Sequence, residues 1–182
     1  KVVSFLSTCV FPDKATYPLT IDQIHTGEPH SSNYAYAYAK RMADIQSRAY
    51  RQQYGCNFVT VIPCNIYGPN DNFNLDSGHV IPSLIHKCYL AKQNNTDLEV
   101  WGTGSPCREF LYSYDAGNIA KWVLKNYDEP DPLIISPDEG TSVATIASLV
   151  AYHMKYDGNI IYNGKQDGQY RKPSDSSRLS EL

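Results

Sequence analysis

The chain has 182 residues, enough for one domain or for most of a larger one. Its net charge is −3 and it has no basic run, which argues against a broad nucleic-acid surface. The longest apolar runs, such as residues 58–62, are too short to cross a bilayer, so we expect no membrane association. Five widely spaced cysteines without a C-x-x-C pair indicate free thiols and favour a cytoplasmic location.

The first part of the chain alternates strand and helix. The predicted elements are, in order, a strand at 1–7, a polar loop at 12–33, a helix at 34–54 capped by Gly55, and a strand at 58–63. The first strand is a continuous apolar run, typical of a strand buried on both faces of a parallel sheet. Because a fold rarely begins with such a strand, we expect further strands of the domain ahead of Lys1. The order predicts a βαβ unit.

The second part continues the α/β pattern. The predicted elements are a turn at 65–73, a helix at 79–93, a strand at 98–102, a turn at 102–107, a strand at 108–112, a helix at 115–127, a strand at 132–136, a helix at 142–156, a strand at 159–163 and a charged tail at 165–179. The turn 102–107 begins like a dinucleotide-binding glycine loop. It carries Cys107 at the last position and leads into a strand, so we reject that interpretation.

Tyr36 and Lys40 have the spacing Y-x-x-x-K, which places both side chains on one face of a helix. A cation one turn away favours the phenolate form of a tyrosine and suits it to acid–base work. In a chain so rich in tyrosine, about one such match is expected by chance. On spacing alone, structural packing is therefore the more frequent explanation.

Polar residues follow both early strands and strengthen the catalytic interpretation. Ser7, Thr8 and Cys9 end the first strand, and residues 63–68 end the second. In open α/β sheets, ligands bind outside the carboxyl ends of the strands, where these segments and Tyr36 converge. This convergence predicts an acid–base site.

Cys9 and His79 are candidates for a proton-transferring pair, because a thiolate base and an imidazole acid can move a proton across a carbon centre. Taken singly, each is more often structural, and their spacing does not show that they meet.

Lys87 and Arg108 can hold phosphate oxygens, and Trp101 can stack on a flat base, although core filling is the more frequent use of tryptophan.

Six motifs together resemble the extended short-chain dehydrogenase/reductase family. They are 7-STC-9, 36-YAYAK-40, 63-PCNIYGPNDNF-73, 78-GHVIPSLIHK-87, 101-WGTGSPCREF-110 and 167-DGQYRK-172. The resemblance covers nearly the whole chain. Within the family, it points to the members that use NADPH to epimerise GDP-4-keto-6-deoxy-D-mannose at C3 and C5 and reduce it at C4 to GDP-L-fucose.

The resemblance implies a Rossmann-like parallel sheet, the C-terminal part of an NADP-binding domain, with a smaller α/β substrate-binding subdomain. The Rossmann part would cover about residues 1–75 and 109–136, and the sugar-nucleotide part about 76–108 and 137–182. The family's glycine-rich NADP loop has no counterpart among these 182 residues and is expected ahead of Lys1. The family also implies a homodimer formed through the helices at 34–54 and 115–127.

The resemblance also implies roles for single residues. Ser7 would bind the C4 carbonyl of the sugar, Tyr36 would protonate it, and Lys40 would act on Tyr36 and hold the nicotinamide ribose. Cys9 and His79 would be the base and acid of the epimerisations. The implied cofactor contacts are Lys40, Pro63, Cys64, Asn65, Ile66 and His79; the implied substrate contacts are Asn65, Lys87, Trp101, Arg108 and Asp167. Position 64 departs from the family, which has threonine there.

Two alternatives stay open. A related nucleotide-sugar 4-epimerase or dehydratase would not require Cys9 and His79. A truncated product could instead act as a non-catalytic binding module, and the missing glycine-rich loop supports that interpretation.

Overall fold

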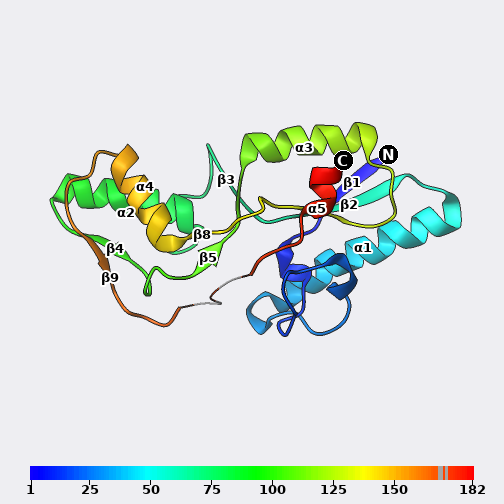
Figure 1. The fold of residues 1–182 in the computed structure, drawn as a ribbon, viewed down its shortest axis with the longest axis horizontal. Helices are drawn as coiled ribbons and strands as arrows, with labels where there is room; N and C mark the ends of the chain where they lie inside the picture. The colour runs from blue at the N-terminus through cyan, green and yellow to red at the C-terminus, as the bar shows by residue number, and fades with distance from the viewer. Residues whose placement is uncertain (168–169, 171) are drawn as a thin grey trace. The chain divides into compact units, whose positions relative to one another are not determined.

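A parallel sheet of three strands organises the larger part of the fold, in the order β1–β2–β7. Strands β1 and β2 are labelled in Figure 1. The strands of this computed structural model, which describes residues 1–167, 170 and 172–182, are β1 (Val2–Phe5), β2 (Phe58–Pro63) and β7 (Leu133–Ile135). The central strand β2 pairs with both neighbours and is buried from Val59 to Pro63. Parallel strands separated by helices confirm the predicted α/β class.

Strand β1 is more exposed than its sequence predicted. Val2 is 45% exposed and Phe5 is 37% exposed, whereas the apolar run predicted burial on both faces. Within the described residues, β1 is an edge strand, because β2 is the only strand hydrogen-bonded to it in this sheet. An apolar strand is buried on both faces only where other parts of the protein pack on both of them.

The predicted helix at 34–54 is confirmed as α1 (Tyr34–Tyr54). Gly55 ends it in the left-handed conformation, with φ 65°, and its N–H bonds to the Arg51 carbonyl. The buried face of α1 is small or polar and packs on β2, where the Thr60 hydroxyl donates to the Asp44 carboxylate at 3.2 Å. A polar contact thus fixes α1 on the central strand.

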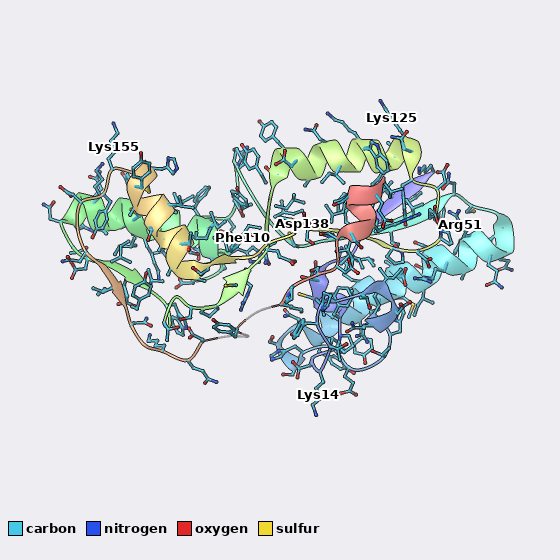
Figure 2. All side chains as sticks on the ribbon, in the orientation of Figure 1. Lys14, Arg51, Phe110, Lys125, Asp138 and Lys155 are labelled. Atoms are coloured by element: carbon cyan, nitrogen blue, oxygen red, sulfur yellow. The ribbon has the colours of Figure 1, made fainter. Side chains whose placement is uncertain are left out.

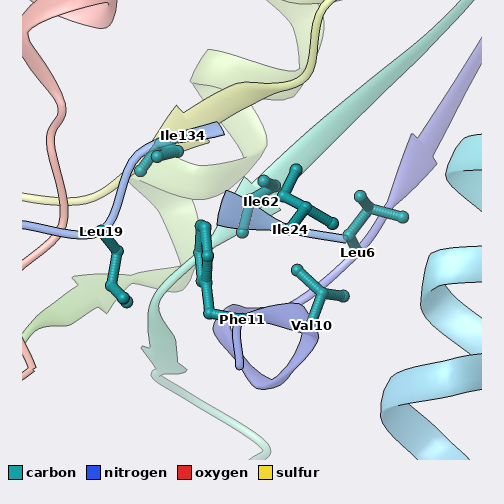
Figure 3. Close-up of a cluster of buried hydrophobic side chains, with 7 residues drawn as sticks. All are labelled: Leu6, Val10, Phe11, Leu19, Ile24, Ile62 and Ile134. Carbon is teal, nitrogen blue, oxygen red and sulfur yellow. The ribbon is translucent and has the colours of Figure 1, made fainter. Parts of the chain in front are cut away.

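Two hydrophobic clusters lie on opposite faces of the sheet, because successive residues of a strand point to opposite sides. Val59 and Val61 of β2 face one cluster, which includes Val123 of α3 (Ser113–Asn126). Ile62 faces the other, which is shown in Figure 3 and consists of Leu6, Val10, Phe11, Leu19, Ile24, Ile62 and Ile134. Each side chain buried this fully contributes about 1.5–3 kcal/mol.

The segment at 12–33, predicted as a polar loop, supplies part of this core. Leu19 and Ile24 are completely buried. Three short 3-10 helices shape the chain around them: η1 (Thr8–Val10), η2 (Ile21–Gln23) and η3 (Ser31–Asn33). The loop is therefore a structural cover for one face of the sheet.

A second small sheet pairs β3 (Asn65–Tyr67) with β6 (Phe110–Tyr112), the strand to which Phe110, labelled in Figure 2, belongs. The sequence predicted only a turn at 65–73. The extended conformation of β3 comes from pairing with a strand more than forty positions away, which local turn chemistry does not reveal.

The remaining elements form a separate group. They are α2 (Val80–Asn94), β4 (Leu98–Val100), β5 (Cys107–Arg108), β8 (Thr141–Ser142), α4 (Val143–His153) and β9 (Ile160–Tyr162). Strands β4 and β9 are parallel, and β5 and β8 are antiparallel. The core of this group lies between α2, α4 and β4 and consists of Leu84, Cys88, Ala91, Leu98, Val100 and Ala147.

The contacts divide the chain into two units. Unit 1 comprises residues 1–66, 109–138 and 173–182, and unit 2 comprises residues 67–108 and 139–172. The expected division assigned all of 137–182 to the smaller part, whereas 173–182, with α5 (Ser177–Glu181), belongs to unit 1. Hydrogen bonds explain this: Leu19 N–H donates to the Pro173 carbonyl at 2.8 Å, and Ser176 donates to Asp138 (labelled in Figure 2) at 3.0 Å.

Among the helices of the described ranges, none has both the length and the apolar character of a membrane span.

Candidate active site

Ser7 and Cys9 lie directly after the carboxyl end of β1. The strand stops at Phe5, and Ser7 caps the 3-10 helix η1, where its Oγ accepts a hydrogen bond from Cys9 N–H at 3.3 Å. Both residues are partly exposed. A hydroxyl and a thiol are thus presented within one short helical turn, at the sheet edge where ligands bind in α/β folds.

Tyr36 and Lys40 lie one turn apart on α1, as their spacing predicted. The Lys40 Nζ is 5.7 Å from the centre of the Tyr36 ring and donates to the Phe5 carbonyl at 2.8 Å. Phe5 is two residues before Ser7, so this bond ties the amine to the strand end that carries the serine. Tyr36 is 49% exposed, which leaves its ring accessible to a ligand.

Arg41, which the sequence did not indicate, holds α1 against η1. Its side chain is 5% exposed, and its Nε donates to the Val10 carbonyl and its Nη1 to the Gly27 carbonyl, both at 2.7 Å. Burial lowers the pKa of the Arg41 guanidinium, and the carbonyl oxygens compensate the buried charge. Arg41 therefore holds α1, the helix that carries Tyr36, to η1 and to the loop at Gly27.

The segment Pro63–Ile66 follows the carboxyl end of β2. Pro63 and Cys64 are buried, whereas Asn65 and Ile66 are exposed. Burial, together with the nearby Glu109 carboxylate, raises the pKa of the Cys64 thiol to about 12. The Cys64 side chain is thus a neutral packing group, and only its backbone is suited to a ligand contact.

Glu109 is a second residue that the sequence did not indicate. It is 5% exposed, and its carboxylate accepts hydrogen bonds from the Ser174 N–H and hydroxyl, both at 2.7 Å. Its backbone carbonyl accepts from the Asn65 side chain at 3.0 Å. The only sequence signal was the acidic residue next to Arg108 at the start of the predicted strand 108–112. Glu109 orients Asn65 and anchors the C-terminal segment.

His79 lies in unit 2, at the position before the first residue of α2. Within the described residues, its side chain makes no capping bond, and it is exposed. The loop before it is ordered by Asn74, whose Oδ1 accepts from the N–H groups of Asp76 and Ser77 at 2.8 and 3.0 Å. Cys9 belongs to unit 1, so neither unit by itself brings the predicted acid and base together.

Four predicted substrate residues line one cavity in unit 2. The cavity has a volume of about 350 Å³, and Lys87, Trp101, Arg108 and Asp167 all contribute to its wall. Trp101 is 57% exposed, with its Nε1 donating to the Gln166 carbonyl at 3.3 Å. Two cations, an indole and a carboxylate in one cavity suit a ligand that combines phosphates with an aromatic base.

Asp167 is held by Thr103. The Thr103 hydroxyl donates to Oδ2 at 2.6 Å and its N–H donates to Oδ1 at 2.9 Å. These two bonds, with a smaller effect of the Arg108 charge, lower the pKa of the Asp167 carboxyl. The remaining motif residues Gly168, Gln169 and Arg171 lie outside the described residues.

Lys165 is a further residue at this site that the sequence did not indicate. Its Nζ lies 4.4 Å from the centre of the Trp101 ring, a cation–π contact.

Comparison with known proteins shows the family of this chain. The pattern of the NAD dependent epimerase/dehydratase family matches residues 1–136. The chain belongs to this family. Among curated members, it is 52% identical to a GDP-L-fucose synthase of Dictyostelium discoideum and 43% identical to a probable GDP-L-fucose synthase of Drosophila melanogaster. These alignments cover 100% and 98% of the chain.

A solved member of the epimerase/dehydratase family has the same fold. A crystal structure of a GDP-L-fucose synthetase from Naegleria fowleri bound to NADP matches with a TM-score of 0.96 and 45% identity over 99% of the chain. The chain spans 59% of that protein, and 58% of the Dictyostelium relative. The comparisons thus establish the family and the fold of these 182 residues, which correspond to part of each relative.

Proposed function

We propose that this chain carries the reduction site and the nucleotide-sugar cavity of an NADPH-dependent epimerase–reductase that converts GDP-4-keto-6-deoxy-D-mannose to GDP-L-fucose. The observation that carries the proposal is the hydrogen bond from Lys40 to the Phe5 carbonyl. This bond holds the Lys40 amine at the end of the strand that precedes Ser7 and Cys9, and Tyr36 lies one helical turn before Lys40. The names of the relatives, at up to 52% identity, support the choice of substrate.

The reduction uses Ser7 and Tyr36. Because the Ser7 Oγ already accepts from Cys9 N–H, its own O–H is available to donate to the C4 oxygen of the sugar. NADPH, when bound, supplies the hydride that reaches C4. Tyr36 delivers a proton to the C4 oxygen, and the Lys40 ammonium favours the phenolate that remains.

The epimerisations use the thiol and the imidazole. The 4-keto group acidifies the C–H bonds at C3 and C5, so a modest base suffices at either carbon. Cys9, as thiolate, takes the proton from one face, and His79 returns a proton to the opposite face, which inverts the carbon. Exchange with solvent then removes the proton from Cys9 and returns one to His79, after which the same pair acts at the second carbon.

The cavity of unit 2 is suited to the GDP part. Lys87 and Arg108 can neutralise the diphosphate, and the exposed indole of Trp101 can stack on the base. The cavity thus offers a place for the nucleotide of the substrate.

The residues present fit the nicotinamide end of NADPH. Lys40 offers an ammonium to the ribose hydroxyls, and the exposed backbone at Asn65 and Ile66 follows the strand end beside it. No glycine-rich phosphate loop occurs within the 182 residues, so this chain supplies the reacting end of the cofactor site.

We also infer that the protein forms a homodimer and acts in the cytoplasm. Exposed apolar side chains on α1, among them Met42 at 56% and Ile45 at 48%, support an interface. All five cysteines, which lie in the described part of the chain, are free thiols, as a reducing compartment favours. Sedimentation of the purified protein tests the dimer, since a monomer at micromolar concentration would contradict it.

The test of the function uses the protein in the longest form that its gene encodes. Incubated with GDP-4-keto-6-deoxy-D-mannose, it should oxidise NADPH and release GDP-L-fucose. Absence of NADPH oxidation would refute the proposal. Product without net consumption of NADPH would favour a 4-epimerase, and failure to bind NADPH in a titration would favour a non-catalytic binding module.

A further inference from the structure

We infer that the turn Gly102–Thr103–Gly104 is a positioning device for the nucleotide cavity, in which Thr103 fixes the carboxylate of Asp167 in its ligand-binding orientation. This inference rests on the proposed function, because it takes the cavity of unit 2 as the nucleotide site. The turn resembles a phosphate-binding loop in sequence but leads into a strand. In the structure, its partner is a side chain of the protein itself.

Three hydrogen bonds orient the device. Thr103 donates through both its backbone N–H and its hydroxyl, one bond to each oxygen of Asp167. The hydroxyl oxygen in turn accepts from the Ser105 N–H at 3.2 Å, so its proton is directed at the carboxylate. A carboxylate held through both oxygens cannot rotate about its terminal torsion without breaking a bond.

The glycine before Thr103 is required by the close approach of the carboxylate. A Cβ on Gly102 would lie 2.0 Å from Asp167 Oδ1, and the residue has φ +73°, a conformation that side chains disfavour. Gly164, in the same unit, has φ +64°, but a Cβ there would meet no atom within 4 Å. Alanine at either position would therefore strain the backbone, but only alanine at Gly102 would also displace Asp167.

The held carboxylate keeps acceptor capacity for a ligand. Each carboxylate oxygen can accept more than one hydrogen bond, so the Thr103 bonds leave acceptor positions on both atoms. Asp167 is partly exposed and lines the cavity with Trp101 and Arg108. A fixed pair of acceptors suits the N–H or O–H donors of a nucleotide, and its orientation is set before the ligand arrives.

The decisive experiment compares Thr103→Val, which removes the hydroxyl at nearly constant volume, with Thr103→Ser, which keeps it. Titration calorimetry with GDP should show roughly 10-fold weaker binding for Thr103→Val, as expected for loss of one hydrogen bond to a charged group, and near wild-type binding for Thr103→Ser. NMR of the Asp167 carboxyl should show its pKa rising toward the ordinary value of ~3.9 in the valine variant only.

Two further comparisons separate positioning from folding. Asp167→Asn should weaken GDP binding, and adding Thr103→Val to it should cause no further loss, because the two residues act as one unit. Gly102→Ala should weaken GDP binding more than Gly164→Ala does. Thermal melts of all variants establish that the losses come from folded protein.

Several results would overturn the inference. They are unchanged GDP affinity in Thr103→Val despite a raised Asp167 pKa, additive losses in the double variant, or equal effects of the two glycine substitutions. Failure of the wild-type protein to bind GDP would instead remove the proposed nucleotide site. In that case the contact can still be tested by NMR: if the pKa of Asp167 is the same in Thr103→Val as in the wild-type protein, Thr103 does not hold the carboxylate.

Discussion

The two units hold their polar site residues by different means. In unit 1, cationic side chains of one helix donate to backbone carbonyls at a strand end and in a 3-10 helix: Lys40 to Phe5 and Arg41 to Val10. In unit 2, Asp167 is held by a turn, and Asn74 orders the loop that precedes α2. The site of unit 1 therefore depends on regular secondary structure, whereas the site of unit 2 depends on turns. Changes in unit 1 should affect turnover or folding, and changes in the cavity of unit 2 should affect affinity.

The largest effect is expected from Tyr36→Phe, which removes the proton donor of the reduction. NADPH oxidation should fall by roughly 10²–10⁴-fold, the usual contribution of a general acid. The affinity for GDP, measured separately by calorimetry, should not change. Tyr34→Phe is a matched control, because Tyr34 lies on the same helix and packs against Tyr38, with ring centres 4.7 Å apart. Equal losses in the two variants would contradict the role of Tyr36.

The next effect concerns folding of unit 1. Arg41→Met removes the donors to the Val10 and Gly27 carbonyls and should lower the free energy of unfolding by about 2–3 kcal/mol. Urea denaturation measures the change. Lys125→Met, on the exposed face of α3, is the control and should change stability by less than about 0.5 kcal/mol. A stability loss no larger for Arg41→Met than for the control would show that the anchor is dispensable.

A smaller effect compares the units directly. Gly55 and Gly164 both have positive φ, 65° and 64°, and a Cβ at either would meet no atom within 4 Å. Alanine at either position should therefore cost only the backbone strain, about 1 kcal/mol. Thermal unfolding of Gly55→Ala and Gly164→Ala tests this. A loss several times larger at one site would reveal a contact that the backbone geometry does not explain.

The smallest expected effect is on Cys64, which should not react with a thiol reagent in the native protein. With its pKa raised to about 12, the thiol stays protonated at pH 8, and burial shields it from reagents. Iodoacetamide at pH 8 should leave Cys64 unmodified while it labels the partly exposed Cys107, as mass spectrometry of the digested protein can show. Labelling in denaturant should modify both. Rapid labelling of Cys64 in the native protein would contradict its assignment as a packing group.

The sequence predicted much of unit 1 because its elements are long and periodic. Helical spacing and Gly55 predicted both ends of α1, and the Y-x-x-x-K spacing predicted that Tyr36 and Lys40 lie one turn apart. It missed the burial of Leu19 inside an apparent loop, because that burial comes from packing against the sheet. It also overestimated the burial of β1, which depends on the strand's neighbours.

Much less of the site in unit 2 could be predicted. The contact between Thr103 and Asp167 joins residues 64 positions apart, and no periodicity relates them. The glycines of the turn indicated tight backbone geometry but not the carboxylate that requires it. The assignment of the tail 173–182 to unit 1 likewise depends on its bonds with Leu19 and Asp138, which only the folded chain brings near.

The central claim is that reduction and epimerisation use different side chains at one site. It is tested most directly by incubating the substrate in D₂O without NADPH and measuring deuterium at C3 and C5 by NMR, for the wild-type protein, Tyr36→Phe and Cys9→Ser in parallel. We predict exchange at both carbons in the wild-type protein and in Tyr36→Phe, and none in Cys9→Ser. Undiminished exchange in Cys9→Ser, or its loss in Tyr36→Phe, would contradict the account.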